Sequence, residues 1–333
     1  MRVLQAICGA LLAACWAGNA TANDKVTVQL DYLPRGNHGI FYVGKSAGFF
    51  AKDGIDIVAI NKGTGSVNTI RQIGTGSGDF GFADLPTLVI ARSQKTPVVS
   101  IAAVNQKSPM AIITLKKTEL RTPKDLEGKS IGVLPFGSTF LFFKAFAAAN
   151  HLDLGKIDVR SITPPSENFL LLGRVDMIPG YIDAELPELE AKAGGPGSLN
   201  VLLGSENGFV AYGSGLVTSE KMIQERPDLV RRFVHAYLQA FAFVIKNPEK
   251  TADAIIADNP EFASRRDVLI AQIKADISKT FTSDATREHG LGYMPESVSK
   301  ATVDMLVTQQ MIPAPIDVSK AFNNSFIKDA PKM

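Results

Sequence analysis

Apolar and polar residues alternate at the start of this chain in a way that predicts a strand, a loop and a helix. Segment 26–30 alternates apolar and polar residues, which is the pattern of a half-buried strand. Pro34 and Gly36 interrupt this pattern and indicate a loop. From Asn37, the predicted helix cap, to Phe50, apolar residues return at helical spacing. The pattern therefore places a helix directly after the first strand.

The same succession of strand and helix continues as far as about residue 217. Further strands are predicted at 55–60, 78–83, 97–104, 130–134, 159–163, 175–179, 199–203 and 209–217. Helices are predicted to open at Ser66, at Asp84 with Pro86, at Ser138 or Thr139, at Ser166 and at Glu185. Beyond Ser219 the pattern is helical, and Pro227 opens a long helix. Strands that alternate with helices predict an α/β fold.

The length of the chain predicts two lobes. A chain of 333 residues exceeds the size at which one hydrophobic core usually stops growing. Between Val104 and Leu115 we expect the chain to cross into a second lobe. Residues 23–106 and 205–333 are predicted to form the first lobe, and residues 107–204 the second. Two crossings form a hinge, and the ligand cleft would lie between the lobes.

Residues 1–22 are interpreted as a signal peptide. Arg2 precedes a mostly apolar run at 3–16, which is too short for a membrane span but suits a signal-peptide core. Ala20-Thr21-Ala22 is a small-x-small cleavage site, so the mature chain is expected to begin at Asn23, in the periplasm. A second interpretation is a lipoprotein, because Leu12-Ala13-Ala14-Cys15 resembles a processing site at which Cys15 carries lipid.

Composition removes several classes of function. The formal net charge is only +2 with interspersed charges, which gives no support for a nucleic-acid partner. Cys8 and Cys15 both lie in the predicted signal peptide, so the mature chain has no cysteine for a disulfide, a metal or a nucleophile. The four histidines are far apart, and the sequence contains no hydrolase or metalloprotease signature. We therefore expect no catalytic residue, metal or cofactor, and we expect a monomer.

Candidate ligand contacts follow the first predicted strand. Asp31 and Tyr32 come directly after it, and Asn37 and His38 open the next helix. In an open α/β sheet, ligands bind outside the carboxyl ends of the strands. Asp31 offers acceptor oxygens, Tyr32 offers a ring surface, and His38 can donate or accept a hydrogen bond.

Two small-residue turns precede predicted helices, one turn in each lobe. The first contains Gly65 and Ser66, and the second contains Gly137, Ser138 and Thr139. Free backbone N–H groups and the helix dipole favour an anion at such a position. A plain turn before a capped helix explains the same residues, and both interpretations remain open.

The other candidate contacts have competing structural explanations. Asp84 is a candidate for the cleft, although an Asp at this position also caps a helix. Phe136, on the loop after the strand at 130–134, and Tyr181 offer ring surfaces. Asp183 and Glu185 offer acceptors, but Glu185 is equally well explained as the start of an exposed helix.

The order of these motifs resembles the periplasmic binding proteins of ABC importers, in the branch for nitrate, sulfonates, taurine and thiamine-pyrimidine precursors. The shared features are Asp31-Tyr32, Asn37-His38, the segment 42–57, the Gly and Asp residues of 76–81, and a Gly-Tyr-x-x-x-Glu-like segment that ends at Glu185. The resemblance covers nearly all of the chain after the predicted signal peptide. It implies a type II-like periplasmic binding fold whose closed form is recognised by an ABC permease and its ATPase.

The resemblance extends to the eukaryotic thiamine-pyrimidine synthase, which has a histidine at the place of His38. That enzyme carries a cysteine-rich motif in the segment that corresponds to 209–217, and this chain has no cysteine there. Together with the predicted signal peptide, this difference favours a binding protein over an enzyme.

The candidate contacts favour a neutral or weakly basic aromatic ligand, such as an aminopyrimidine that is a thiamine precursor. The expected rings belong to Tyr32, Phe136 and Tyr181, whereas the carboxylates of Asp31, Asp183 and Glu185 would repel an anion. The alternative ligand is a sulfonate, nitrate, taurine or an organic carboxylate. Such an anion would be held at Ser66 and at Ser138-Thr139, with Arg35 as a further contact.

Overall fold

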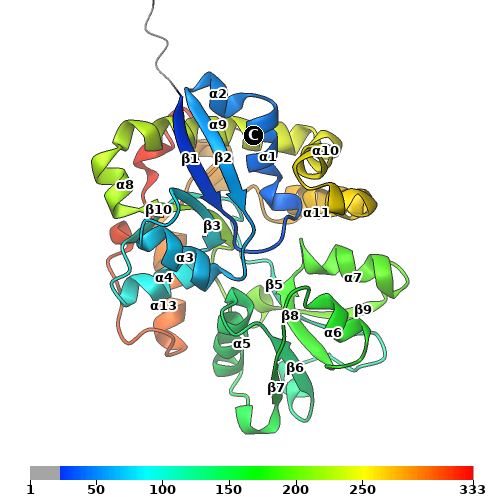
Figure 1. Cartoon of the computed structure of the whole chain (residues 1–333). Coiled ribbons are helices and arrows are strands. Elements are labelled where there is room, and N and C mark those ends of the chain that lie inside the picture. Colours follow the sequence, from blue (N-terminus) through cyan, green and yellow to red (C-terminus); the bar gives the residue numbers. More distant parts are fainter. Residues whose placement is uncertain (1–22, 333) are drawn as a thin grey trace, which may run out of the picture.

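The computed structural model describes residues 23–332 and shows two lobes, each built on one five-stranded sheet with helices around it (Figure 1). The predicted signal peptide, including Cys8 and Cys15, lies outside the described residues. Within residues 23–332, no helix is both long and apolar enough to cross a membrane.

The sheet of the first lobe, drawn mainly in blue and cyan in Figure 1, has the strand order β2-β1-β3-β10-β4. Its strands are β1 (Asp24–Gln29), β2 (Ile55–Asn61), β3 (Phe80–Asp84), β4 (Val98–Ala103) and β10 (Ser214–Ser219). β1 pairs in parallel with β2 and β3, whereas β10 runs antiparallel to β3 and β4. The carboxyl ends of the parallel strands therefore meet at one edge, which faces the second lobe.

The sheet of the second lobe repeats this plan, with the order β7-β6-β8-β5-β9. Its strands are β5 (Met110–Leu115), β6 (Ser130–Val133), β7 (Asp158–Ser161), β8 (Met177–Tyr181) and β9 (Leu199–Leu203). β6 pairs in parallel with β7 and β8, and β5 runs antiparallel to β8 and β9. The fourth strand in each order, β10 in the first sheet and β5 in the second, is the first strand after the chain crosses from the other lobe.

Helices cover both faces of each sheet (Figure 1). In the first lobe they are α1 (Gly39–Ser46), α2 (Phe49–Lys52), α3 (Ser66–Gly74), α4 (Leu85–Ser93), α8 (Glu220–Glu225), α9 (Pro227–Lys246), α10 (Pro248–Asp258), α11 (Arg266–Lys279), α12 (Asp284–His289) and α13 (Glu296–Thr308). In the second lobe they are α5 (Ser138–Ala149), α6 (Glu167–Leu171) and α7 (Glu185–Ala193). Helix α11 also contacts α7, so the C-terminal helices reach across the boundary between the lobes.

The core of the first lobe explains why the C-terminal helices return to it. The aromatic residues Phe233, Tyr237 and Phe241 of α9 are buried, and the ring of Phe233 stacks on that of Phe80 with 3.6 Å between ring centroids. The ring of Tyr237 packs against that of Phe41 of α1 at a tilt of 47°, with 4.9 Å between centroids. Burial of these rings ties α9 to the sheet and to α1, so the helices after residue 219 stabilise the lobe that the N-terminal strands begin.

The two crossings lie side by side at the hinge, and one predicted strand is shorter than expected there. The strand predicted at 209–217 begins only at Ser214, because residues 209–213 run past the first crossing instead of joining a sheet. The amide of Gly213 donates to the carbonyl of Asn105, and a Cβ on Gly213 would lie 2.6 Å from the Cβ of Asn105. The close approach of the two crossings therefore requires glycine at this point.

Candidate ligand-binding site

Most of the predicted contact residues meet between the lobes, at the carboxyl ends of β1 and β8. They line a small cavity of about 20 Å³, whose walls come from both lobes. Its lining comprises Asp31, Tyr32, Arg35, Gly65, Ser66, Leu134, Gly137, Ser138, Thr139, Ser166, Pro179, Tyr181 and Glu185. The prediction that these segments lie close together therefore agrees with the geometry of the structure.

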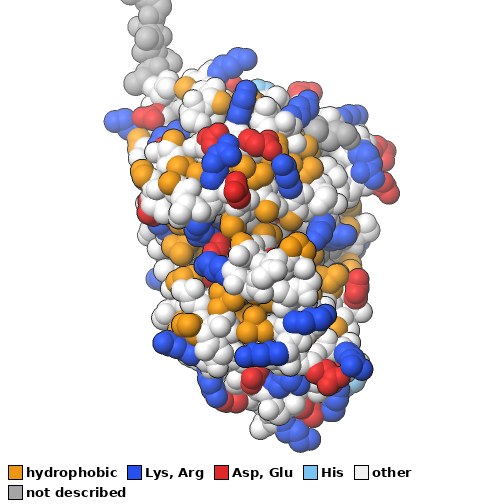
Figure 2. Space-filling view, turned by 90° about the vertical axis from the view of Figure 1, so that its right-hand side faces the viewer, with side chains coloured by type: hydrophobic (Ala, Val, Ile, Leu, Met, Phe, Trp, Pro, Cys, Tyr) orange, Lys and Arg blue, Asp and Glu red, His pale blue; other side chains and the backbone are white. Residues whose placement is uncertain are grey.

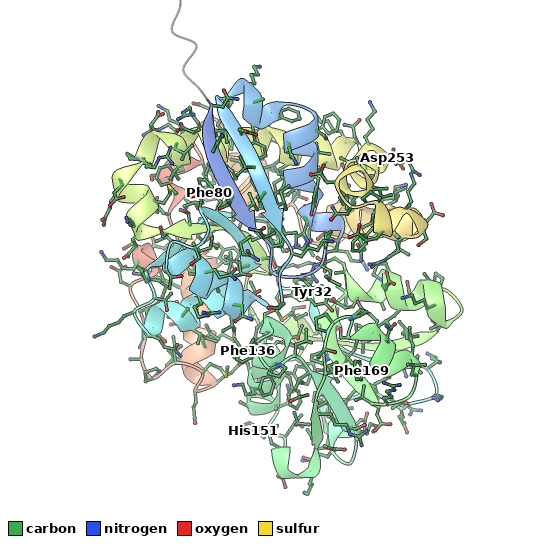
Figure 3. The ribbon with its side chains drawn as sticks, viewed as in Figure 1. Tyr32, Phe80, Phe136, His151, Phe169 and Asp253 are labelled. Atoms are coloured by element: carbon green, nitrogen blue, oxygen red, sulfur yellow. The ribbon has the colours of Figure 1, made fainter. Side chains whose placement is uncertain are left out.

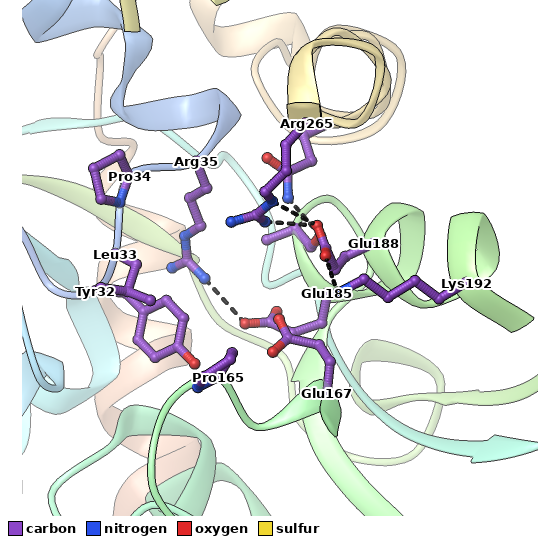
Figure 4. A pocket seen from close by; sticks show the side chains of 12 residues that line it. Tyr32, Leu33, Pro34, Arg35, Pro165, Glu167, Glu185, Glu188, Lys192 and Arg265 are labelled. Carbon is purple, nitrogen blue, oxygen red and sulfur yellow. Dashed lines mark hydrogen bonds and ion pairs between the residues drawn. The ribbon is translucent and has the colours of Figure 1, made fainter. Parts of the chain in front are cut away.

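The side chain of Arg35 lies in this site near two tyrosine rings, and Figure 4 shows it beside the ring of Tyr32. The guanidinium carbon lies 4.8 Å from the ring centroid of Tyr181 and 5.5 Å from that of Tyr32. The guanidinium donates to Asp31 from Nη2 (3.1 Å) and to Glu185 from Nη1 (3.2 Å). Burial would lower the pKa of Arg35, but the two carboxylates outweigh it and raise that pKa. We call this space, bounded by Tyr32 and Tyr181, the tyrosine slot.

Asp31 is held as a carboxylate by its two partners. His38 Nε2 lies 2.8 Å from Asp31 Oδ1, and this imidazole is fully buried. Burial would raise the pKa of Asp31, but Arg35 and His38 together lower it. Burial lowers the pKa of His38, so a neutral imidazole donates from Nε2 to the carboxylate. His38 therefore supports Asp31 from behind and does not line the slot itself.

Glu185 and Tyr181 belong to one hydrogen-bonded unit in the second lobe. Glu185 Oε2 accepts from the backbone amide of Tyr181 at 2.7 Å, so the first residue of α7 closes the turn after β8. The Tyr181 hydroxyl lies 2.7 Å from Ser138 Oγ. Burial raises the pKa of Glu185 to about 7, against the opposing effect of Arg35. Glu185 is thus both the start of a helix and a buried group of the site.

Three residues that the sequence predicts as helix caps do not cap. Asn37 lies inside the 3-10 turn Gly36–His38, and Ser66 and Ser138 are the first residues of α3 and α5 after the glycine N-caps Gly65 and Gly137. The hydroxyls of Ser66 and Ser138 have other partners. Ser66 Oγ accepts from the amide of Asp84, and Ser138 Oγ forms a hydrogen bond with the Tyr181 hydroxyl. The cap predictions for these residues were therefore wrong.

The two small-residue turns meet across the cleft. A Cβ on Gly65 would lie 2.3 Å from the carbonyl oxygen of Phe136, so the first turn touches the second directly. The backbone of Gly65 has φ +137°, a conformation that favours glycine. The N-termini of α3 and α5 thus face each other at the edge of the tyrosine slot.

The remaining predicted contacts lie outside the slot. Asp84 caps α4 by accepting from the amide of Thr87 at 2.9 Å, and burial raises its pKa to about 7. Phe136 points outward from its loop, with 60% of its surface exposed (Figure 3). Asn37 is buried beside the slot without lining it.

Asp183 lies at the hinge, in a buried cluster that joins the lobes. Asn105 Nδ2 lies 3.1 Å from Asp183 Oδ2 and 2.8 Å from Asp276 Oδ1, on α11. Asp183 Oδ1 and Asp276 Oδ2 have no hydrogen-bond partner among the described residues. Burial first, and then the charge of Asp183, raises the pKa of Asp276 well above its usual value. The closeness of the two carboxyl groups, which share Asn105 Nδ2 as a donor, therefore favours the protonated form of Asp276.

A second cavity of about 230 Å³ adjoins the slot and is shown in Figure 4. Its lining includes Tyr32, Leu33, Pro34, Arg35, Pro165, Glu167, Ala184, Glu185, Glu188, Lys192, Arg265 and Gln272. Arg265, just before α11, donates to Glu188 of α7 at 2.6 Å. Gln272 accepts from the amide of Gly36 at 2.9 Å and donates to the carbonyl of Ala184 at 2.8 Å. These contacts close one side of the cleft.

Sequence reasoning did not assign Glu167, Glu188, Arg265 and Gln272 to the site. Glu167 and Glu188 look like ordinary charges on short helices, and the pattern of α11 gives no sign that this helix reaches the second lobe. The sequence does indicate that Arg35 is near the site, because it lies on the loop between two predicted contacts, Tyr32 and Asn37. Its central position could only be seen once the lobes were placed together.

Comparison with known proteins identifies relatives over most of the chain. The family model described as NMT1/THI5 like matches residues 35–251. The riboflavin-binding protein RibY of Chloroflexus aurantiacus is 26% identical over 305 residues, which cover 91% of this chain and 86% of that protein. The formylaminopyrimidine-binding protein of Halalkalibacterium halodurans is 24% identical and covers 75% of this chain and 76% of its own length. The 4-amino-5-hydroxymethyl-2-methylpyrimidine phosphate synthase of Legionella pneumophila is 21% identical. The match covers 94% of this chain and 95% of that protein.

Solved structures share the fold. The alkanesulfonate-binding protein SsuA of Xanthomonas axonopodis superposes with a TM-score of 0.67 at 15% identity, over 91% of this chain and 99% of that chain. A Candida albicans protein with the generic periplasmic binding protein fold gives a TM-score of 0.66 at 13% identity, over 90% and 96%. The predicted α/β fold with two lobes of the periplasmic binding protein type is confirmed.

Proposed function

Because this chain belongs to the NMT1/THI5-like family, we propose that it is the substrate-binding component of an ABC import system. Its ligand is a small aromatic or heterocyclic molecule, such as an aminopyrimidine that serves as a thiamine precursor. Two relatives named for binding riboflavin and formylaminopyrimidine support a heterocycle. The lobes would close on the ligand, and an ABC permease with its ATPase would recognise the closed form.

The single observation that carries this proposal is the environment of the Arg35 guanidinium. That group is flat and rich in donors, it lies near two tyrosine rings, and it donates to Asp31 and Glu185. An aminopyrimidine is also flat, and its amino group and ring nitrogens need the same stacking surfaces and acceptors. A ring that takes this position replaces the guanidinium and receives both carboxylates as its partners.

An anion is the second candidate ligand, and Arg35 is the observation that favours it. The cation lies beside the facing N-termini of α3 and α5, where a sulfonate, nitrate, taurine or a carboxylate would be stabilised. Asp31 and Glu185 already neutralise Arg35, however, and both would lie next to the anion. This arrangement favours the heterocycle over the anion.

We also infer that the protein binds its ligand without converting it. The family includes proteins named as pyrimidine phosphate synthases, so an enzyme is the rival from another class. The absence of cysteine after residue 15 removes the motif that the resemblance associates with the synthase. Recovery of unaltered ligand by mass spectrometry, in a one-to-one ratio with protein, supports binding, whereas turnover to a pyrimidine product contradicts it.

The export and domain predictions remain part of this proposal. The leader pattern of residues 1–22 supports a monomeric protein in the periplasm that begins at Asn23, and lipid at Cys15 is the alternative. The positions of the sheets support a first lobe of 23–106 and 205–333 and a second lobe of 107–204. Intact-mass analysis of the exported protein distinguishes the two N-termini.

Calorimetric titration with 4-amino-5-hydroxymethyl-2-methylpyrimidine and with taurine tests the ligand class. Glu185→Gln places a donor against the ring's amino group and should weaken pyrimidine binding by about 1–3 kcal/mol. Tyr181→Ala should remove stacking of about 0.5–1.5 kcal/mol beyond the lost area. Glu225→Gln, at an exposed position on α8, is the matched control. Undiminished pyrimidine affinity in Glu185→Gln, or tighter taurine binding by the wild type, would favour the anion.

A further inference from the structure

The 230 Å³ cavity adjoins the tyrosine slot and shares three of its residues, Tyr32, Arg35 and Glu185. Its other walls come from the loop at Pro165, from α7 and from the segment around Arg265 (Figure 4). At roughly 30 Å³ for each water-sized group, it has room for a substituent of about seven such groups. A molecule whose ring lies in the slot would extend into this cavity without any further opening.

The charges that line the cavity are paired, with one exception. Glu188 is held by Arg265 at 2.6 Å and by Lys192 at 2.6 Å, so its two oxygens are both engaged. Arg35 is engaged by Asp31 and Glu185. Both cations on the α7 side are therefore committed to Glu188, and Glu167 is the acid that remains.

Glu167 is nine-tenths buried, with 6% of its surface exposed, and it lines the cavity. Its Oε2 has no hydrogen-bond partner among the residues that the structure describes. Burial, and then the charge of Glu188, raises the pKa of Glu167, and its own backbone amide, Arg265 and Lys192 offset this rise only in part. A buried polar atom without a partner is costly, and a ligand atom can satisfy it.

We propose that this cavity is a second subsite, which receives a hydroxyl or amino substituent of the ligand with Glu167 as its hydrogen-bond partner. The inference rests on the proposed function, because the ring in the tyrosine slot positions the substituent. A hydroxyl fits either form of Glu167, since it donates to a carboxylate and accepts from a carboxylic acid. An amino group fits the carboxylate. A phosphate group fits poorly, because the three cations of the lining are already paired with carboxylates and Glu167 adds a further acid.

The substrate class of the site is therefore an unphosphorylated heterocycle with a donor-bearing side chain. Because the cations of the lining are engaged and Glu167 is not, the cavity disfavours phosphate esters of the same heterocycle and thus distinguishes a precursor from its activated form. This specificity comes from repulsion as much as from the new hydrogen bond.

The test uses four probes that share one ring. They are 4-amino-2-methylpyrimidines with a methyl, hydroxymethyl, aminomethyl or phosphorylated hydroxymethyl group at position 5. Calorimetric titration of the full mature chain should show the hydroxymethyl probe bound about five- to tenfold more tightly than the methyl probe. The aminomethyl probe should bind at least as tightly as the hydroxymethyl probe, and the phosphate ester should bind more weakly than the methyl probe.

Glu167→Ala should reduce the hydroxymethyl-to-methyl ratio to about one. Glu167→Gln keeps the shape of the side chain and replaces the alanine variant in this test if that variant does not fold. It should retain the hydroxymethyl preference within a few-fold but lose the aminomethyl preference, because the charge is gone. Glu185→Gln should weaken all of the unphosphorylated probes together, and Glu225→Gln should change none.

The failures of the two proposals give different results. An unchanged hydroxymethyl-to-methyl ratio in Glu167→Ala, with the Glu185 effect intact, overturns the subsite alone. Tight binding of the phosphate ester also overturns the subsite. If no pyrimidine probe binds, the proposed function fails and the subsite fails with it, because its ring anchor is wrong.

Discussion

At the scale of single residues, one arginine sets the electrostatics of the site. Arg35 is buried between the lobes, and both of its carboxylate partners are buried as well. The sequence shows the arginine and both acids but not that they meet, because Glu185 is 150 residues away in the chain. Predicting the chemistry of the candidate residues was therefore possible from sequence, whereas predicting their mutual neutralisation required the fold.

Arg35→Ala should lower the free energy of unfolding by about 3–5 kcal/mol, because Asp31 and Glu185 then lie buried without a cation. An aminopyrimidine probe should raise the melting temperature of this variant more than that of the wild type, since the ring fills the position of the guanidinium. Thermal unfolding with and without the probe measures both effects, and Arg231→Ala on the exposed face of α9 is the control. An equal or smaller shift in Arg35→Ala would contradict the slot, and a taurine-induced shift found only in the wild type would support an anion.

At the scale of elements, the sequence predicted the strands and helices that carry the candidate contacts. It did not predict which elements close the cleft between the lobes. Residues 26–30 and 175–179 show clear apolar patterns, so the strands before Asp31 and Tyr181 were found with small errors at their ends. The partners of α7 could not be found in this way. Arg265 and Gln272 meet the second lobe because α11 crosses the boundary between lobes, and local periodicity carries no information on such a contact.

Gly65→Ala should impair closure of the lobes, because its Cβ would lie 2.3 Å from the carbonyl oxygen of Phe136 in the opposite lobe. Backbone strain at φ +137° adds a cost of about 1–3 kcal/mol. We expect weaker ligand binding and a larger radius of gyration with ligand, measured by calorimetry and small-angle scattering.

Gly76→Ala is the matched control for this prediction. Gly76 also has a positive φ, +76°, but a Cβ there has no neighbour within 4 Å, so the variant carries strain without an interlobe clash. Equal ligand affinity in the two variants would show that the contact between Gly65 and Phe136 does not belong to the closed form.

At the scale of the whole molecule, two buried carboxyl groups from opposite lobes accept from the same amide, that of Asn105, beside the hinge. Asp183 belongs to the second lobe, and Asp276 lies on α11 of the first lobe. Asp276 holds its proton more firmly while the lobes are together, because opening would expose it to water and return its pKa toward the ordinary 3.8. Closed protein therefore binds more protons than open protein, and closure should weaken as pH rises above about 4.

Asp276→Asn should remove this pH dependence. The amide donates to Asp183 without a proton from solvent, while its oxygen still accepts from Asn105 and Thr280. Small-angle scattering between about pH 4 and pH 9 should show a radius of gyration that increases with pH in the wild type and is flat in the variant. A wild-type radius that does not change with pH would mean that the proton does not contribute to closure.

The strand order of the two sheets has a consequence for the order in which the chain can fold. The first sheet has β10 between β3 and β4, and β10 follows every strand of the second lobe in the chain. As the chain emerges from its N-terminus, β4 has no neighbour in its own sheet until residue 214 is available. All five strands of the second sheet are complete by Leu203. The second lobe, although it begins later, is thus the first part of the protein whose sheet can form in full.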